Sequence, residues 1–325
     1  QTKNVWQVWS CNKRSPLKEK LRTWWLHCWI LPNIWGRTNT NATQVLQYKE
    51  EEGTHPNSLY DAKIPLISKP DKHVTKENAV VNNNASLSFG DDSVGIYAKK
   101  AIVNLRGTGT NDISVGKNGI GVAAEDSTVN LLTDYGFQIK DKGVGIYAKN
   151  TNTSTGTMNV KYTGAVTEAG TGTYFKGTGS NPLTNKLDIN VNNVSNTTKG
   201  MIGIYAKDAD FTNEGYIQVT NTDTLGFGII SSGADVTNKG VITLEDSSDP
   251  TKPNIGMYTV DSNPLKNMGK ITVGKNGIGI YGKNFSNGDS ATLPNSTIEV
   301  GENGIGVYTE AGAGENIKLE SGSIK

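Results

Sequence analysis

Histidine and cysteine, the side chains most often used as a catalytic base or nucleophile, are confined to the first quarter of this 325-residue chain. All three histidines precede residue 74, and the only cysteines are Cys11 and Cys28. A Ser/His/Asp or Cys/His nucleophilic set therefore cannot be assembled from residue 91 onward. Cys11, His27 and Cys28 also lack the paired spacing that zinc sites use. We expect two unpaired thiols, no metal site and no cofactor.

Carboxylates are the remaining candidates for catalysis, since glycoside hydrolysis can be carried out by Asp and Glu alone. The candidates are Asp208 with Asp210, and Glu245 with Asp246 and Asp249. Both groups lie in or near predicted loops, where solvated surface charge is the favoured interpretation. The sequence predicts that this chain is not an enzyme. The alternative is a β-helix polysaccharide hydrolase or lyase, or a glycan-binding protein of the phage tailspike type.

One recurring tyrosine position is the candidate binding site. If the chain stacks these tyrosines, they form an outward ladder, and such ladders can bind sugar rings or partner proteins. Aromatic ladders also stabilise stacked strands simply by packing in register, which is the favoured interpretation here. The tyrosines are Tyr97, Tyr147, Tyr174, Tyr205, Tyr258, Tyr281 and Tyr308.

The tyrosines recur because the chain is built from repeats. An anchor motif of an apolar residue, Gly, an apolar residue, Tyr and a small residue occurs nine times with variations. Its glycines are 23 to 31 residues apart, with a mean near 26. Variable spacing is typical of a solenoid of short strands, which absorbs insertions in its turns. The glycines are Gly95, Gly121, Gly145, Gly172, Gly203, Gly228, Gly256, Gly279 and Gly306.

Each anchor motif has the alternation of a half-buried strand. In the first copy, Val94, Ile96 and Ala98 are expected on the core face, with Gly95 and Tyr97 on the other. The internal stack should then contain the residue that follows the glycine in seven of the nine copies. Its predicted members are Ile96, Ile146, Ile204, Ile229, Met257, Ile280 and Val307.

A second strand follows an Asn-x-Gly turn in several repeats, as in residues 212–219 and 237–244. A Gly-Lys-Asn-Gly or Gly-Glu-Asn-Gly turn then leads back to the anchor, within residues 115–119, 273–277 and 300–304. No helical periodicity separates these strands. The fold class predicted is all-β: a right-handed parallel β-helix of about nine rungs with a period near 26 residues.

Composition limits the partners. The net charge is +1, and lysines outnumber arginines by 28 to 4. Nucleic-acid readout relies on basic patches and Arg forks, so no nucleic-acid partner is expected. The longest apolar stretch, residues 24–35, is too short to span a bilayer.

The first 76 residues differ from the rest. All six tryptophans, both cysteines and three of the four arginines lie at or before position 37. We divide the chain into an atypical segment, 1–76, and a β-helix repeat region, 77–325. The segment is expected to be disordered or non-native; a separate module and a stretch translated out of frame are both open.

The tandem Gly-Ile-Tyr-Ala-Lys and Gly-Lys-Asn-Gly-Ile-Gly-Ile-Tyr units resemble the passenger repeats of large outer-membrane autotransporters, which are adhesins of type V secretion. The resemblance covers about residues 77–325 and rests on a structural motif. In that family a C-terminal translocator barrel flanks the passenger, and we expect this chain to be a fragment without it. Membrane attachment would then occur only through that barrel.

The resemblance implies a virulence-type surface protein of a Gram-negative bacterium, displayed at the outer membrane or secreted. Its partner would be an unidentified protein or glycan on host or bacterial cells. The lack of cysteine over residues 91–325 fits passage through an oxidising compartment. A truncated product with no function of its own is a further alternative.

Overall fold

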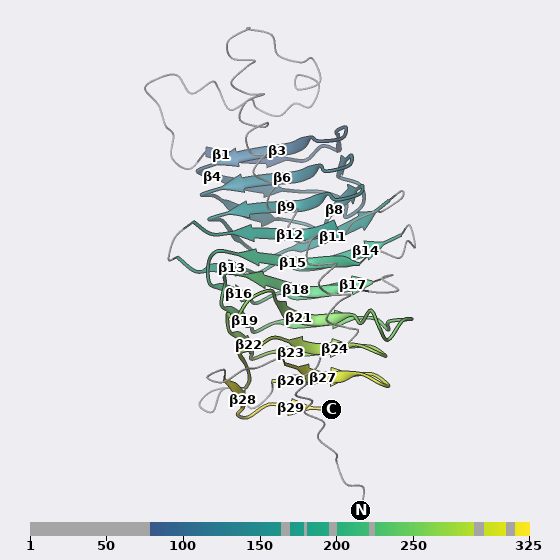
Figure 1. The fold of residues 1–325 in the computed structure, drawn as a ribbon. Helices are drawn as coiled ribbons and strands as arrows, with labels where there is room; N and C mark the ends of the chain where they lie inside the picture. The colour runs from purple at the N-terminus through teal and green to yellow at the C-terminus, as the bar shows by residue number, and fades with distance from the viewer. Residues whose placement is uncertain are drawn as a thin grey trace, which may run out of the picture.

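The computed structural model describes residues 79–163, 170–178, 181–194, 200–220, 225–288, 296–309 and 316–325. The expected segment 1–76 lies outside them. The described residues form 29 strands and no helix. The paired strands of the described residues are parallel, and successive turns stack into a rod from β1 at one end to β29 at the other (Figure 1).

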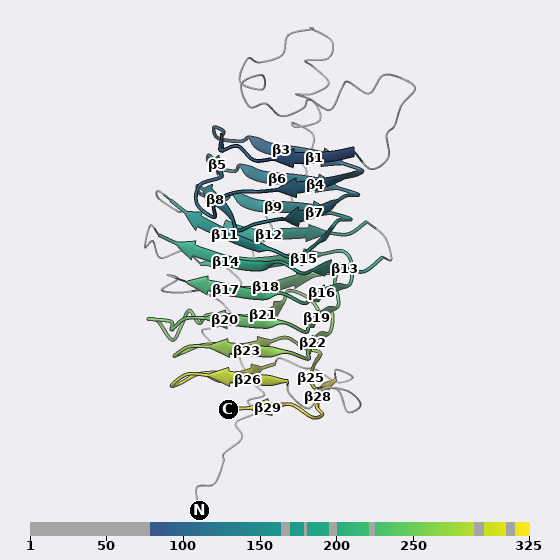
Figure 2. The same cartoon turned by 180° about the vertical axis from the view of Figure 1, so that it is seen from behind.

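Each turn of the coil contributes one strand to each of three sides (Figure 2). The anchor motifs form a nine-stranded sheet, here called the anchor sheet. Nine stacked strands define eight full turns, so the predicted solenoid and its period near 26 residues are confirmed. The anchor strands are β3 (Val94–Lys99), β6 (Ile120–Glu125), β9 (Val144–Lys149), β12 (Gly170–Lys176), β15 (Met201–Lys207), β18 (Phe227–Ser232), β21 (Ile255–Thr259), β24 (Ile278–Tyr281) and β27 (Ile305–Tyr308).

The second side is a ten-stranded sheet that precedes the anchor sheet in each turn. It includes the strands that follow the Asn-x-Gly turns. Its members are β2 (Leu87–Ser88), β5 (Ile113–Val115), β8 (Tyr135–Ile139), β11 (Thr157–Tyr162), β14 (Asp188–Asn193), β17 (Tyr216–Thr220), β20 (Val241–Leu244), β23 (Lys270–Val273), β26 (Thr297–Val300) and β29 (Ser323–Ile324).

The third side is divided into a four-stranded and a six-stranded sheet. The first holds β1 (Ala79–Asn83), β4 (Ala101–Leu105), β7 (Thr128–Leu131) and β10 (Asn152–Thr153). The second holds β13 (Leu183–Asn185), β16 (Phe211–Asn213), β19 (Val236–Asn238), β22 (Leu265–Asn267), β25 (Phe285–Asn287) and β28 (Ile317–Leu319).

One continuous hydrophobic core runs inside the coil. The residues after the anchor glycines align rung to rung, as in the pairing of Ile204 with Ile229 and of Ile229 with Met257. The predicted internal stack is therefore confirmed, with Val307 only partly buried at the last anchor strand. Burying each such aliphatic side chain contributes roughly 1.5–3 kcal/mol relative to leaving it exposed.

The anchor strands depart from the predicted alternation at their glycines. Ile202, the residue before Gly203, was expected on the core face with Ile204 and instead lies on the outer face with Tyr205. A Cβ on Gly203 would lie 2.7 Å from the carbonyl oxygen of Gly228 and 2.5 Å from the Ile217 side chain. The glycine therefore occupies an inner position with no room for a side chain, and the alternation shifts by one residue there.

A buried asparagine ladder lines the corner after the six-stranded sheet. The Nδ2 group of Asn213 donates to Oδ1 of Asn238 at 2.9 Å, and Asn238 donates in the same way to Asn267 at 2.9 Å. Each amide also donates to a backbone carbonyl two residues along the chain. Buried polar groups are stable only when satisfied, so the ladder holds the rungs in register. Its members are Asn185, Asn213, Asn238, Asn267 and Asn287.

Candidate functional site: the outer face of the anchor sheet

The predicted tyrosines lie in one column of the anchor sheet, pointing away from the core. Tyr147, Tyr174 and Tyr205 are paired in register, as are Tyr258, Tyr281 and Tyr308. Tyr174 and Tyr205 stack with ring centroids 5.0 Å apart and planes 3° apart. The column is interrupted, because Ala123 separates Tyr97 from Tyr147 and Ile230 separates Tyr205 from Tyr258.

A second apolar column runs beside the tyrosines, formed by the residues that precede the anchor glycines. The two columns make one hydrophobic cluster, separate from the core. Apart from Leu225 and Val260 in loops, all of its members come from the anchor strands. We call it the outer strip: Val94, Ile120, Ala123, Val144, Tyr147, Tyr174, Ile202, Tyr205, Leu225, Phe227, Ile230, Ile255, Tyr258, Val260, Ile278, Tyr281, Ile305 and Tyr308.

Most of the tyrosine column is shielded from solvent. Tyr97 is 37% exposed and Tyr281 is half-buried, whereas Tyr147, Tyr174, Tyr205, Tyr258 and Tyr308 are buried. Burial disfavours the phenolate, and it raises the pKa of Tyr97 to about 12, with the Glu125 charge as a second cause. The pKa values of Tyr147 and Tyr174 are raised further, again mainly by burial. The outward ladder is thus largely unavailable to a partner in this conformation.

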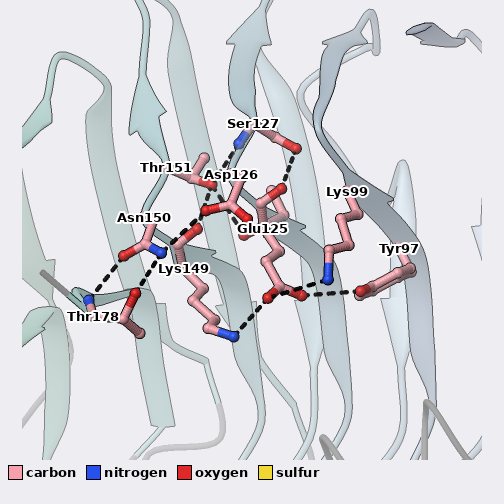
Figure 3. Close-up of polar contacts among 10 residues, drawn as sticks. Tyr97, Lys99, Glu125, Asp126, Ser127, Lys149, Asn150, Thr151 and Thr178 are labelled. Carbon is pink, nitrogen blue, oxygen red and sulfur yellow. Dashed lines mark hydrogen bonds and ion pairs between the residues drawn. The ribbon is translucent and has the colours of Figure 1, made fainter. Parts of the chain in front are cut away.

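A charged network closes the exposed end of the column (Figure 3). The Tyr97 hydroxyl donates to one oxygen of Glu125 at 3.1 Å, and Lys149 Nζ donates to the other at 2.6 Å. Lys99 Nζ lies 3.6 Å from the same carboxylate. Partial burial raises the pKa of Glu125, but the bond from Lys149, the two lysine charges and the Tyr97 bond outweigh it and lower the pKa.

The corner beside this network is tied across three rungs. Asn150 Nδ2 donates to Asp126 at 3.1 Å and to Thr178 Oγ1 at 2.6 Å (Figure 3). Asp126 and Asn150 have φ values of 48° and 46°, the left-handed region that Asn and Asp adopt most readily among residues with a side chain. The predicted turns also place Asn276 in this region, with φ of 56°. These residues shape corners and are not gathered into a reactive site.

The carboxylates weighed for catalysis lie at two different corners of the coil. Asp208 and Asp210 follow β15, where Asp208 is in the left-handed conformation with φ of 59°. Asp246 follows β20 and accepts a hydrogen bond from the Lys275 backbone amide at 2.7 Å. The Asp249 carboxylate accepts from the Thr251 amide at 2.8 Å. Both contacts are those of turn-forming residues.

Asp112 is a buried carboxylate that sequence reasoning did not single out. It accepts hydrogen bonds from the backbone amides of Thr108, Gly109 and Gly136 at 2.9, 3.0 and 2.7 Å. The Asp112 side chain therefore satisfies the backbone amides of the Gly-rich loop from within the chain. A Thr-Gly-Thr loop followed by Asp is the available signal, since Asp commonly caps such turns.

Within the described residues, no group of three or more His, Cys, Asp or Glu side chains is placed to hold a metal ion. The same residues contain no helix long and apolar enough to cross a membrane.

Comparison with known proteins gives one match. Residues 191–268 match the family model described as the BigA third pectate lyase-like domain. This stretch runs from β14 to just beyond β22, within the stacked turns. No curated protein and no solved structure matches the chain. The match and the β-solenoid together fit the repeat region of a surface-exposed, adhesin-type protein.

Proposed function

We propose that this chain is a non-enzymatic rod from the passenger of an outer-membrane autotransporter, displayed on a Gram-negative cell for adhesion to host or bacterial cells. The observation that carries the proposal is the parallel stack with its continuous nine- and ten-stranded sheets, because a β-solenoid offers long lateral faces suited to extended contacts. The family match within the stack supports the same class of protein.

The chemistry of the described residues supports a binding role over catalysis. The candidate carboxylates are divided between corners and take part in turns. The charged network at the exposed end of the tyrosine column is already internally paired. We propose a protein or glycan of the partner cell as the ligand, with no nucleic acid and no cofactor.

The test is adhesion of cells that display the parent passenger with Tyr205, Tyr258 and Tyr281 all changed to Ser. Because Tyr205 and Tyr258 are buried, the matched control replaces all three by Phe, which keeps the ring packing. If the column binds the partner, the Ser variant loses adhesion at equal display and the Phe variant retains most of it.

Adhesion by the Ser variant equal to that of the unchanged protein would limit the column to a structural role. Cleavage of a polysaccharide by the purified rod would overturn the proposal in favour of the hydrolase or lyase alternative. Absence of adhesion by the unchanged passenger to both host and bacterial cells would overturn the adhesive function.

A further inference from the structure

Three corners of the coil share a turn that plays no part in the proposed adhesion. Each contains Asn followed by Gly, at residues 118–119, 276–277 and 303–304. The three asparagines have φ values of 53°, 56° and 56°. In each turn the glycine amide donates to the carbonyl of a glycine three residues earlier, at 3.2, 3.2 and 3.0 Å. The backbone conformation is therefore alike in the three turns, and any difference between them comes from the side chains.

Asn followed by Gly is a sequence in which a side-chain amide can react with its own backbone. The glycine nitrogen attacks Cγ of the asparagine and loses its proton, while the Cγ–Nδ2 bond breaks and Nδ2 leaves as ammonia. Water then opens the cyclic succinimide at either carbonyl and leaves aspartate or isoaspartate. Glycine favours ring closure because it has no side chain and adopts the required conformations easily. Water is the only co-reactant, and nothing is oxidised or reduced.

Two of the three asparagines have their side-chain amides tied to the preceding rung. Asn118 Nδ2 donates to Asp92 Oδ1 at 2.9 Å, and Asn276 Nδ2 donates to the Ser247 carbonyl at 2.8 Å. Both asparagines are half-buried. The ring closes only after Cγ turns toward the glycine nitrogen, so each of these hydrogen bonds must break before the reaction.

Asn303 lacks this restraint. Its side chain is exposed, and no described residue forms a hydrogen bond with it. In the other two turns the partner lies on the preceding rung, and that rung is present here too, since Val273 pairs with Val300. The difference is therefore a property of this turn.

A fourth Asn-Gly pair, Asn287 and Gly288, is held most firmly. Asn287 is 0% exposed in the asparagine ladder, where its Oδ1 accepts from Asn267 Nδ2 at 2.8 Å. The Gly288 amide donates to the Asn267 carbonyl at 2.9 Å. Both reacting groups are thus engaged inside the coil, and this pair should react most slowly.

We propose that Asn303 is a modification site, where succinimide formation with Gly304 converts the amide to aspartate and isoaspartate without an enzyme. The reaction is faster here than at the other three Asn-Gly pairs of the described residues. One restraining hydrogen bond slows ring closure by roughly two- to tenfold, and the need to open a buried site slows it further. The proposal concerns the chemistry of this turn and does not depend on adhesion.

The product alters the edge of the anchor sheet. The turn leads directly into β27, whose first amide, that of Ile305, donates to the Gly277 carbonyl at 2.8 Å. Isoaspartate adds a methylene to the backbone just before this bond, and either product adds a carboxylate next to Glu302. Lengthening the turn and adding like charge both favour detachment of β27 from β24.

Mass spectrometry of the full chain tests the order of reaction. The chain is kept in warm, mildly alkaline buffer, natively and in urea, and conversion at each Asn-Gly pair is followed in proteolytic peptides. Dividing each native rate by the rate of the same pair in urea removes the effect of neighbouring residues in sequence. We expect the largest ratio at Asn303, ratios at Asn118 and Asn276 lower by roughly twofold or more, and the smallest at Asn287. A ratio at Asn303 equal to or below that at Asn118 or Asn276 would overturn the proposal.

Removing one restraint tests its cause. Asp92→Gly deletes the acceptor of Asn118 and keeps the left-handed conformation, φ 54°, that glycine adopts freely. We expect conversion at Asn118 to rise by roughly two- to tenfold. The matched control is Asp126→Gly, φ 48°, which deletes an acceptor of Asn150, a residue followed by Thr. No acceleration at Asn118, or equal acceleration in both variants, would contradict the role of the side-chain bond.

Hydrogen exchange checks the consequence for the anchor sheet. After prolonged incubation, the amides of residues 305–308 should exchange faster than in the fresh chain. Asn303→Ser cannot form the succinimide, so its exchange at these residues should not change on incubation. Equal changes in Asn303→Ser and in the unaltered chain would show that conversion of Asn303 does not loosen β27.

Discussion

Two faces of this rod are built from the same kind of strand and have different surroundings. On the ten-stranded sheet, Asn159, Asn190 and Gln218 point outward and remain in contact with water. On the anchor sheet, Ile202 and Tyr205 also point outward and are buried. In a β-solenoid, pointing away from the core is therefore not the same as being exposed.

Composition accounts for part of the difference. The outward positions of the ten-stranded sheet are mostly Asn, Gln, Thr, Lys and Glu, which pair along the rod, as Asn190 Nδ2 does with Asn159 Oδ1 at 3.0 Å. The anchor sheet instead has two apolar outer columns, because each glycine shifts the alternation by one residue. The second apolar column, beside the tyrosines, is what makes the outer face of the anchor sheet hydrophobic.

The largest difference between the two faces is expected when a charged residue is placed on each and the losses in the free energy of unfolding are compared. Ile230→Asp places a carboxylate in a fully buried outer position, and we expect a loss of about 3 kcal/mol or more in the free energy of unfolding. Val241→Asp places it on the half-buried face of the ten-stranded sheet, where water can solvate it. Urea denaturation measures both, and equal losses would mean that the two faces are equally accessible.

The glycine that shifts the alternation should be nearly as sensitive. Gly203→Ala forces a Cβ against the Gly228 carbonyl oxygen and Ile217, and we expect a cost of about 1–3 kcal/mol or more. Gly90→Ala is the control, since no atom of the described residues lies within 4 Å of its added Cβ. Thermal unfolding of the two variants should differ clearly; a neutral Gly203→Ala would remove the steric explanation of the shift.

One polar side chain sits within the outer strip and offers a stabilising change. The Thr171 hydroxyl is buried and has no hydrogen-bond partner among the described residues; Thr171 is in register with Val144 and Ile202. Thr171→Val should stabilise the fold by about 1 kcal/mol, because it removes an unsatisfied buried polar group. Thr243→Val on the half-buried face should change stability little. A destabilised Thr171→Val variant would show that the hydroxyl is satisfied in solution.

The smallest effect is expected at the exposed end of the tyrosine column. The pKa of Glu125 is lowered in the folded state, so its stabilising contribution is present above its ordinary pKa and is lost as the pH falls through the folded value. The contribution should be no more than about 1 kcal/mol, as for other surface ion pairs.

Glu125→Gln should therefore flatten the loss of thermal stability below about pH 4.5, relative to the unchanged chain. It should also lower the pKa of Tyr97 from about 12, because the carboxylate charge beside the phenol is gone. Alkaline absorbance titration checks this second effect. An unchanged acid profile together with an unchanged Tyr97 titration would show that the network does not form in solution.

Much of the fold follows from the sequence alone because the repeat is local. The anchor motif fixes an inner residue in every rung, and the stack of Ile204, Ile229 and Met257 follows once the rungs align. Turns such as the one at Asn276 are equally readable, since Asn followed by Gly favours the left-handed conformation. The column position of the tyrosines was predictable for the same reason.

Contacts between distant parts of the chain determine how deeply the tyrosine column is buried. They also determine that the residue before each anchor glycine lies on the same face as the tyrosines. Gly203 faces Ile217 and Gly228, which lie on another sheet and on the next rung, so the space available to it cannot be read from its neighbours in sequence. An alternation with a period of two predicts which face of a strand a residue occupies only where every position has room for a side chain. The sequence therefore determined which residues repeat and stack, whereas crowding between rungs decided which face each one occupies and how much water reaches it.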